Sequence, residues 1–274
     1  MSSFTEFTAA EAREHIAVPR PDDDKYSRGV LGIITGSPEY PGAAVLGVEA
    51  ALRTGVGMVR FVGAKNVATL VLQRRPEAVT TDGRVQAWLL GSGMDVDARD
   101  DETTERLSRA LGQGVPAVID AGALDLLSVA SRTAGVVITP HFGELARVLA
   151  IDRETIRDNP ADAALRASDQ LGVTVLLKGH RSYIAAADGS RFMCTGAPAW
   201  LATAGAGDAL GGILGALVAS HAKHSVADVG MLARLAATAC VVHSLAAHRA
   251  SAGGPFTILD LAEQLSPTIA RLIA

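Results

Sequence analysis

The chain has few aromatic residues. Of its 274 residues, 4% are Phe, Trp or Tyr, whereas 49% are hydrophobic and 28 are glycine. The interior must therefore be built from Ala, Val, Leu and Gly, which is typical of closely packed helices and parallel strands. The length suits one large α/β domain or two small ones, and it is sufficient to bury a sizeable core.

An excess of charge of either sign is also missing. The chain has 25 Lys and Arg against 29 Asp and Glu, a formal net charge of −4, and no run of basic residues. A surface built to bind a polyanion such as nucleic acid is therefore not expected. Any phosphate-bearing ligand must be held by a few local groups.

Cysteine is scarce, and long apolar runs are lacking. Cys194 and Cys240 lie in apolar sequence without the spacing of metal ligands, which predicts two reduced, buried thiols and no dedicated metal site. The N-terminal residues show neither the basic nor the apolar stretch of a leader peptide. The longest apolar runs, around 209–219 and 235–247, are too short and too interrupted by Gly or His to span a bilayer. We expect a cytoplasmic protein without a membrane contact.

What the sequence does contain is a series of short apolar segments that alternate with helical ones. A helix is expected over 43–54. Each apolar segment ends at Gly, Asp or Pro, and we predict buried strands over 29–35, 58–62, 85–90, 116–120 and 136–139. Continuous apolar strands alternating with helices indicate an α/β fold, with a mostly parallel sheet covered by helices on both faces.

The pattern changes at residue 173. Three runs with a hairpin signal at Asp188-Gly189 predict a small antiparallel meander over 173–178, 181–189 and 190–195. Three helices should follow, over 206–220, 225–250 and 257–273. Repeats and long linkers are absent from the sequence. We therefore expect one domain over residues 1–274, with 1–25 as an N-terminal arm or short helix.

The loop that opens the helix at 206 is made of small residues and one acid, Asp208. Such a loop presents backbone N–H groups at a helix N-terminus, where the dipole favours an anion. A carboxylate there would repel a phosphate. Asp208 either caps the helix, worth about 1 kcal/mol, or takes a proton from a hydroxyl that attacks a phosphoryl group. The loop alone leaves both interpretations open.

Other polar or glycine-rich segments follow predicted strands, at 36–44, 91–93 and 139–144. Ligands of open α/β sheets bind beyond the carboxyl ends of the strands, so each segment is a candidate wall of a site. Each also has a plainer interpretation as a tight turn or a helix start. His141 follows a proline that directs the chain outward, and it could donate to a substrate amide or phosphate. Glu144 could serve merely to favour the first helical turn.

The segment Lys-Gly-His-Arg-Ser at 178–182 joins two strands of the expected meander. Its lysine and hydroxyl could hold a nucleotide phosphate, and the plainer interpretation is an exposed turn. It is not a Walker A loop, which needs Gly-x4-Gly-Lys-Ser/Thr opening a helix. The loop at 205–212 is no dinucleotide fingerprint, because it lacks a clear preceding strand and an acid about 20 residues further on. A simple dehydrogenase is thereby excluded.

Taken in order, seven segments resemble one family. They read GSPEYPGAA, ALRTGVGMV, GSGMD, DAGAL, TPHFGEL, LLKGHRS and TGAPAWLATAGAGDALGGILGAL. Together they resemble the ADP-dependent NAD(P)H-hydrate dehydratases of the ribokinase-like superfamily, over roughly residues 25–250. The GAGD tetrapeptide is shared with ribokinase-like sugar and vitamin kinases, whereas TPHFGE and GSPEYPGAA favour the dehydratases. Ala204, Ala206 and Phe142 depart from the usual family residues, which bears on substrate or nucleotide preference.

The resemblance implies a ribokinase-like fold and a hydro-lyase that restores NADH or NADPH from its hydrated S form (NADHX or NADPHX). ADP would be the co-substrate, giving AMP and phosphate, and Mg²⁺ would ride on the nucleotide phosphates. Asp208 would be the catalytic base. By the same resemblance, the positions that contact the substrate are Ala44, Gly93, His141 and Asp208. Those that contact the nucleotide are Lys178, Gly179, His180, Arg181, Ser182, Gly205, Ala206 and Gly207.

Several points stay open at this stage. An ATP-dependent kinase of a small alcohol or vitamin precursor would use the same Asp208, and a non-catalytic nucleotide-binding module would use the loop without turnover. A purely structural protein fits poorly with so many glycine-rich strand ends. A separate NAD(P)H-hydrate epimerase is a possible partner. The Ala-rich helix over 230–250 suggests a homo-oligomer, with a tetramer as one arrangement.

Overall fold

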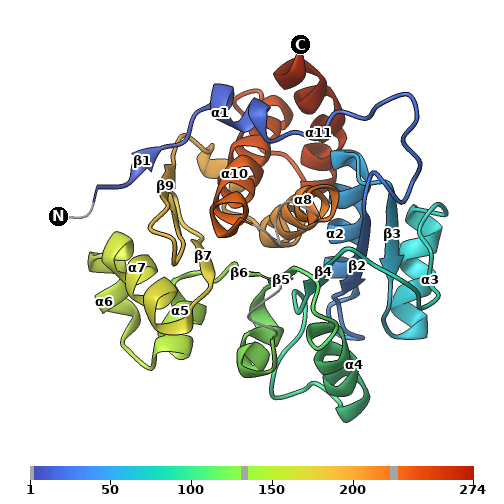
Figure 1. Ribbon diagram of the computed structural model, residues 1–274, viewed down its shortest axis with the longest axis horizontal. Helices are drawn as coiled ribbons and strands as arrows, with labels where there is room; N and C mark the ends of the chain where they lie inside the picture. The colour runs from blue at the N-terminus through green and yellow to red at the C-terminus, as the bar shows by residue number, and fades with distance from the viewer. Residues whose placement is uncertain (1–2, 131–134, 223–227) are drawn as a thin grey trace.

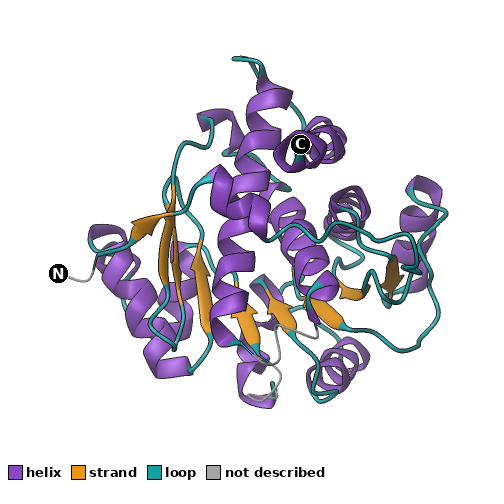
Figure 2. Ribbon diagram, turned by 45° about the horizontal axis from the view of Figure 1, so that its top comes forward, coloured by secondary structure: helices purple, strands orange, loops and turns teal. Residues whose placement is uncertain are grey.

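The computed structural model describes residues 3–130, 135–222 and 228–274. A nine-stranded sheet runs through its centre in the order β1-β9-β8-β7-β6-β5-β4-β2-β3 (Figures 1 and 2). Pairing is parallel from β3 to β7, antiparallel between β7, β8 and β9, and parallel between β9 and β1. The strands are β1 (Thr5–Glu6), β2 (Val30–Ile34), β3 (Met58–Phe61), β4 (Ala87–Leu90), β5 (Ala117–Ile119), β6 (Val136–Ile138), β7 (Thr174–Leu177), β8 (Ser182–Ala185) and β9 (Arg191–Cys194).

Helices cover both faces of the sheet (Figure 2). One face carries α1 (Ala9–Glu14), α2 (Pro41–Thr54), α3 (Lys65–Arg74), α8 (Ala206–Ser220), α10 (Val229–Ser251) and α11 (Ile258–Ile273). The other carries α4 (Asp101–Leu111), α5 (Phe142–Leu149), α6 (Arg153–Asp158), α7 (Pro160–Leu171) and the 3-10 segment η1 (Ala121–Val129). A short 3-10 turn, η2 (Ala199–Leu201), lies between β9 and α8.

Two hydrophobic cores fill the space between the sheet and these helices. In β2, Leu31 and Ile33 belong to the core under α8 and α10, whereas Val30 and Ile34 belong to the opposite one. This alternation follows from the period of two in a strand. It explains why the strands are apolar throughout, since both faces of the sheet are buried.

The same alternation positions polar side chains at the ends of the strands. Three of them stand two residues beyond a member of the core under α8: Asp120 after Val118, Thr139 after Val137 and Lys178 after Leu176. Their strands β5, β6 and β7 are neighbours in the sheet. The three side chains are therefore brought together at the edge where the N-terminus of α8 lies.

The α/β class, the parallel sheet, the helices on both faces and the antiparallel meander are confirmed. The hairpin at Asp188-Gly189 is present, with Gly189 at φ +90°. The N-terminal arm is more ordered than expected, since β1 pairs with β9 and α1 packs on α10. Of the helix expected over 225–250, residues 225–227 lie outside the described part of the chain, and α10 continues to Ser251.

One expectation about α10 is wrong. Within the described residues, the helix over Gly230–Ser251 is long and apolar enough to cross a membrane, although the sequence runs looked too short. Of its most apolar window, 72% is already buried inside the molecule, against α8, α11, α1 and the sheet. The Ala-rich residues therefore serve the core of this chain. Their composition gives no separate reason to place a subunit interface on this helix.

Candidate functional site

A buried carboxylate, Asp120, lies at the carboxyl end of β5. Its Oδ1 accepts hydrogen bonds from Lys178 Nζ at 2.7 Å and from Thr139 Oγ1 at 2.9 Å. The residue is 3% exposed. A buried carboxylate is tolerated only when it is paired and hydrogen-bonded, and these two donors satisfy that condition.

The backbone around Asp120 is constrained. Ala121, the next residue, has φ +40°, a conformation that costs a non-glycine residue about 1 kcal/mol or more. A Cβ on Gly91 would lie 2.3 Å from the Asp120 carbonyl oxygen, so only glycine fits there. Asp120 precedes η1, yet its side chain makes no capping hydrogen bond to that segment. The carboxylate is thus committed to Lys178 and Thr139.

Lys178 reaches from the end of β7 into this cluster, and its side chain is 18% exposed. Burial by itself lowers the pKa of Lys178, but the carboxylates of Asp120, Glu144 and Asp208 outweigh it, and the net pKa lies above the ordinary value. The ammonium lies 3.8 Å from Glu144 Oε2. It is therefore a permanent cation, held where the strands end.

Asp208 stands in the first turn of α8. The helix begins at Ala206, and its N-cap is Gly205, at φ +89° and without a side-chain capping bond. The interpretation of Asp208 as the N-cap is therefore wrong, because a glycine with positive φ occupies that position.

Burial, reinforced by the negative charge of Asp120, raises the pKa of Asp208 to about 6. The Ser92 hydroxyl and the Lys178 ammonium oppose this rise. Ser92 Oγ is buried and makes no hydrogen bond of standard geometry to the described residues.

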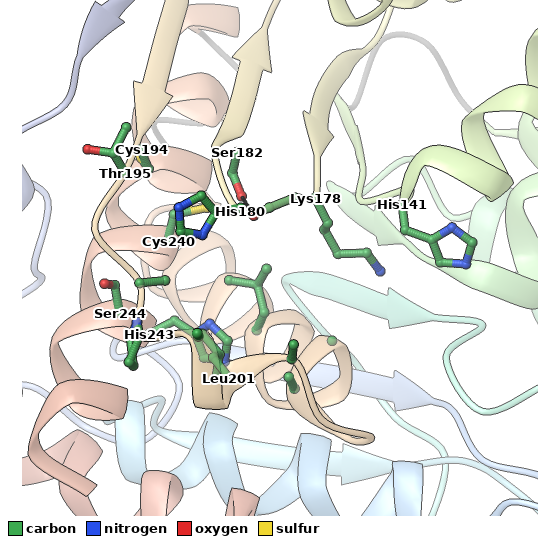
Figure 3. Close-up of a pocket in the computed structure, with 18 residues that line it drawn as sticks. His141, Lys178, His180, Ser182, Cys194, Thr195, Leu201, Cys240, His243 and Ser244 are labelled. Carbon is green, nitrogen blue, oxygen red and sulfur yellow. Dashed lines mark hydrogen bonds between the residues drawn. The ribbon is translucent and has the colours of Figure 1, made fainter. Parts of the chain in front are cut away.

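A cavity of about 490 Å³ opens beside Lys178 (Figure 3). It lies between the ends of β7, β8 and β9, the start of α8 and the middle of α10. Seven residues of the anticipated site line it: His141, Lys178, Gly179, His180, Ser182, Ala206 and Gly207. Arg181 is exposed and does not line it, and a Cβ on Gly205 would lie 2.5 Å from Leu46 Cδ1, against α2. The structure thus brings most of the predicted nucleotide residues to one cavity.

The floor of this cavity contains groups that the sequence did not single out as ligand contacts. Cys194 and Cys240 both line it; they are buried and free, as expected. His243 is 6% exposed, and burial lowers its pKa to about 4, against the effect of the Ala206 carbonyl. The imidazole is therefore neutral near about pH 7. Leu201 and Leu210 complete an apolar wall suited to a base.

A second cavity, of about 780 Å³, lies on the other side of the cluster. Its walls come from Tyr40, from Met94 to Asp97, from the start of η1 and from α5, which contributes Glu144. Ala44 and Gly93 do not line either cavity. They pack beside it: Ala44 is fully buried, and a Cβ on Gly93 would lie 2.3 Å from Ala43 Cβ and 3.1 Å from the Tyr40 carbonyl. Their contacts shape the loop that carries Tyr40.

His141 is the N-cap of α5. Its Nδ1 accepts from the backbone N–H of Gly143 at 2.9 Å and of Glu144 at 3.2 Å, while Glu144 Oε2 accepts from the His141 N–H at 2.7 Å. Because Nδ1 accepts, the neutral ring carries its proton on Nε2. Nε2 lies 3.2 Å from Glu144 Oε1, and the side chain is 54% exposed, so a ligand that reaches this N–H shares it with Glu144. Glu144 does favour the first turn, as expected, and in addition it lies beside Lys178.

The two cavities therefore meet at one charged cluster. Lys178 lines the first cavity, Glu144 and Ala121 line the second, and Asp120 lies between them. Asp208 faces Asp120 and Lys178 from α8. Asp208 itself lines neither cavity, but its neighbour Gly207 lines the first. A base with a pKa of about 6 beside this cluster suits proton removal during transfer of a group between two ligands.

The sequence did not identify Asp120 and Thr139 as site residues. The signal for both was available in retrospect, because each is a polar residue two positions after a buried strand residue on the face under α8. That pattern identifies a face only once the order of the strands is known.

Comparison with known proteins gives the family. A sequence model described as NAD(P)H-hydrate dehydratase matches residues 31–271. The chain belongs to this family. Its sequence is 30% identical to the ADP-dependent (S)-NAD(P)H-hydrate dehydratase of Bacillus subtilis, over 87% of this chain and 93% of that protein. It is 40% identical to the bifunctional NAD(P)H-hydrate repair enzyme Nnr of Mycobacterium tuberculosis, over 78% of this chain and 46% of that protein. The chain thus matches about half the length of the bifunctional relatives.

The fold of this dehydratase family member is ribokinase-like. The crystal structure of ADP/ATP-dependent NAD(P)H-hydrate dehydratase from B. subtilis, co-crystallised with ATP/Mg²⁺, matches with a TM-score of 0.83 at 23% identity, covering 99% of this chain and 100% of that one. A ribokinase-like superfamily protein from Enterococcus faecalis matches with a TM-score of 0.83 at 24% identity, covering 98% and 96%. At these identities the likeness concerns the fold.

Proposed function

We propose that this protein catalyses the ADP-dependent dehydration of hydrated NADH and NADPH, restoring the reduced cofactor and releasing AMP and phosphate. The observation that carries the proposal is Asp208, a carboxylate with a raised pKa in the first turn of α8, next to Gly207 and the cation of Lys178, which both line the first cavity. Membership of the family and the names of its relatives support the choice of substrates.

The first cavity is proposed to hold ADP. The apolar wall of this cavity accepts the adenine base of ADP. The phosphates of ADP meet Lys178 and the backbone N–H groups at the start of α8, where the helix dipole favours an anion. Among the described residues, no three His, Cys, Asp or Glu side chains form a metal-ligating group. Mg²⁺ would accordingly enter on phosphate oxygens, as this ion usually does. It would neutralise charge on those oxygens.

The second cavity is proposed to hold the hydrated dinucleotide, with its ring hydroxyl directed at Asp208. The hydroxyl oxygen attacks the β-phosphorus of ADP, the bond to AMP breaks, and Asp208 takes the hydroxyl proton. Lys178 and the N–H groups of the 205–208 loop stabilise the charge on the transferring phosphoryl group. The ring nitrogen lone pair then expels the phosphate, and the neighbouring ring carbon loses a proton. The sum is loss of water from the ring at the expense of one phosphoanhydride bond.

His141 and Ser182 are both proposed to bind ligands from the first cavity. His141 lies next to Glu144, which lines the second cavity, and its Nε2–H is proposed as a donor for the end of the substrate that reaches the first; the Ser182 hydroxyl would contact the nucleotide. The backbone of Gly179 and His180 lies alongside, and Gly207 leaves room next to Lys178. Ala44 and Gly93 would act on the substrate indirectly, by shaping the loop that carries Tyr40.

The test is recovery of the near-ultraviolet absorbance of reduced nicotinamide when purified protein is mixed with hydrated NADH and either ADP or ATP. We expect recovery that depends on ADP and on active protein. A small-alcohol kinase would instead accumulate a phosphate ester with ATP, and a non-catalytic module would give no turnover. Either result would contradict the proposal.

We further propose that the protein works in the cytoplasm as a homo-oligomer, a tetramer being one arrangement, together with a separate epimerase. Exposed aromatic side chains, including Trp200 at 52% exposure, support self-association. The name of the bifunctional repair relatives supports a second activity that accompanies dehydration. Sedimentation at several protein concentrations tests the first point. For the second, adding an NAD(P)H-hydrate epimerase should allow a mixture of hydrate epimers to be repaired completely.

A further inference from the structure

Asp120 binds the cation of Lys178 at the centre of the site. Lys178 Nζ lies 2.7 Å from Asp120 Oδ1 and 3.8 Å from Glu144 Oε2. It also lies 3.4 Å from where a Cβ on Gly207 would stand, so the ammonium reaches the first turn of α8 beside Asp208. Three carboxylates therefore surround one ammonium, and the shortest contact goes to the carboxylate that is buried deepest.

The choice of partner matters for Asp208. If Lys178 paired directly with Asp208, the opposite charge would stabilise the ionised carboxylate and make it a weaker base. A pair with Asp120 removes that competitor and leaves a negative charge near Asp208, which disfavours its ionisation. The groups facing Asp208 are Asp120 at the end of β5, Lys178 at the end of β7 and the Ser92 hydroxyl after β4.

We propose that Asp120 is a positioning residue that holds Lys178 at the junction of the two cavities and keeps Asp208 free to act as the base. This inference deepens the proposed function and rests on it. Asp120 is oriented for this task, since it does not cap η1, it has a second donor in Thr139, and the strained Ala121 follows it. Local strain kept at a buried polar cluster is typical of functional sites.

The first test is the pH profile of kcat for Asp120→Asn, which keeps the shape and one acceptor oxygen but removes the charge. We expect kcat at about pH 7 to fall roughly tenfold, because part of the general-base contribution is lost. The acidic limb should move about one pH unit lower, a typical size for the loss of one neighbouring charge. Thr139→Val, which removes one hydrogen bond from Asp120 and no charge, should keep the wild-type limb. An unchanged limb in Asp120→Asn would overturn the proposal.

A second test does not need turnover. The carboxyl pKa of Asp208 can be followed directly by isotope-edited infrared spectroscopy on the wild type and on Lys178→Met. Removing the ammonium while Asp120 stays ionised should raise the pKa of Asp208, whereas Asp120→Asn should lower it. Shifts in the same direction, or none, would overturn the positioning role. Lack of any wild-type turnover would instead contradict the proposed function, so the two failures are distinguishable.

Discussion

Asp208 illustrates how one residue reconciles two conflicting demands. A helix N-terminus attracts phosphate, yet a carboxylate placed there repels it. Burial and the charge of Asp120 raise the pKa of Asp208 to about 6, so that the group exchanges a proton close to neutrality. The same residue can therefore accept the hydroxyl proton as negative charge moves onto the phosphate.

Replacing this carboxylate should separate chemistry from binding. Asp208→Asn keeps the size of the side chain, so we expect kcat to fall by roughly 10²–10⁴-fold, the usual range for a lost general base. ADP affinity, measured by calorimetry, should be retained or slightly raised, because a negative charge near the phosphates is gone. A variant with near wild-type kcat would contradict the role of Asp208 as the base.

The raised pKa of Asp208 also fixes the pH dependence. Activity should decline as the pH falls below about 6, since the base becomes protonated.

The same pKa also makes the stability of the protein depend on pH, in the opposite direction to that of a carboxylate held in an ion pair. The folded state resists ionisation, so a penalty develops between the ordinary pKa of 3.8 and about 6 and is complete above it. Asp208→Asn should therefore raise the free energy of unfolding by about 2 kcal/mol at about pH 8. It should show little gain at about pH 3.5, which urea denaturation at both pH values would check.

Lys178 provides a test of which cavity holds which ligand. Lys178→Ala removes the cation that lines the first cavity, so we expect ADP affinity to fall more than the affinity for the hydrated dinucleotide. A loss of about tenfold for ADP would be typical of one charge-assisted contact. Separate titrations with each ligand measure the ordering. A larger loss of affinity for the hydrated dinucleotide than for ADP would contradict the assignment of ADP to the first cavity.

At the scale of elements, the helices that carry the site loops end in different ways. Both α2 and α4 end at glycine, but Gly55 has φ +103°, whereas Gly112 has φ −76°. A Cβ on Gly55 would meet no atom within 4 Å, so backbone strain alone opposes a side chain there. The two positions form a matched pair that isolates the conformation of the backbone.

We expect Gly55→Ala to destabilise the protein by about 1 kcal/mol, because alanine resists the left-handed conformation. Gly112→Ala should be neutral or slightly stabilising, since its backbone is helical. Thermal unfolding of the two variants would measure the difference. Equal effects would show that the two helix ends are not distinguished by φ.

A buried ion-pair cluster joins α2 to α3. Glu49 on α2 is fully buried, and its carboxylate meets Arg53, Arg74 and Arg75, the last through two contacts, of which Nη2–Oε1 measures 2.5 Å. Burial favours the neutral acid, but the three guanidinium groups outweigh it and lower the pKa of Glu49 to about 2. The carboxylate is thus charged throughout the range in which the protein works.

Glu49→Gln should destabilise the protein by about 2 kcal/mol, less than for a wholly buried pair because the arginines can turn toward water. The loss should be present at about pH 7 and shrink as the pH falls below the ordinary value of 4.5 toward about 2, where wild-type Glu49 is itself protonated. Glu102→Gln, which breaks an exposed pair with Arg106, should cost less than about 0.5 kcal/mol. Urea unfolding of both variants would check the contrast.

For the molecule as a whole, the buried strands could be predicted from the sequence better than the elements that depend on pairing with a distant segment. Buried strands such as β2 and β4 carry apolar residues on both faces, and this local signal needs no partner. The two-residue strand β1 has no such signal, because only its pairing with β9 makes it a strand. The helix predicted over 225–250 is close to the observed α10, but its apolar stretch was judged too short because His and Gly interrupt the run.

The same distinction applies to the site. Lys178 and Gly207 were predicted to contact the nucleotide and His141 the substrate, and the structure places all three on one cavity. Asp120 depends on the adjacency of β5, β6 and β7, which no local motif reveals. Of the two interpretations that the loop left open for Asp208, the helix cap is excluded, because Gly205, with its positive φ, is the N-cap three residues earlier.

The central claim is that the substrate's own hydroxyl attacks the phosphoryl group of ADP. Hydrated NADH prepared in water enriched in heavy oxygen carries the isotope on that hydroxyl. After turnover with unlabelled ADP in ordinary water, mass spectrometry should find the heavy oxygen in inorganic phosphate, with AMP and NADH formed in equal amounts. Heavy oxygen in the solvent, with unlabelled phosphate, would mean that water leaves the ring directly, and it would contradict this account.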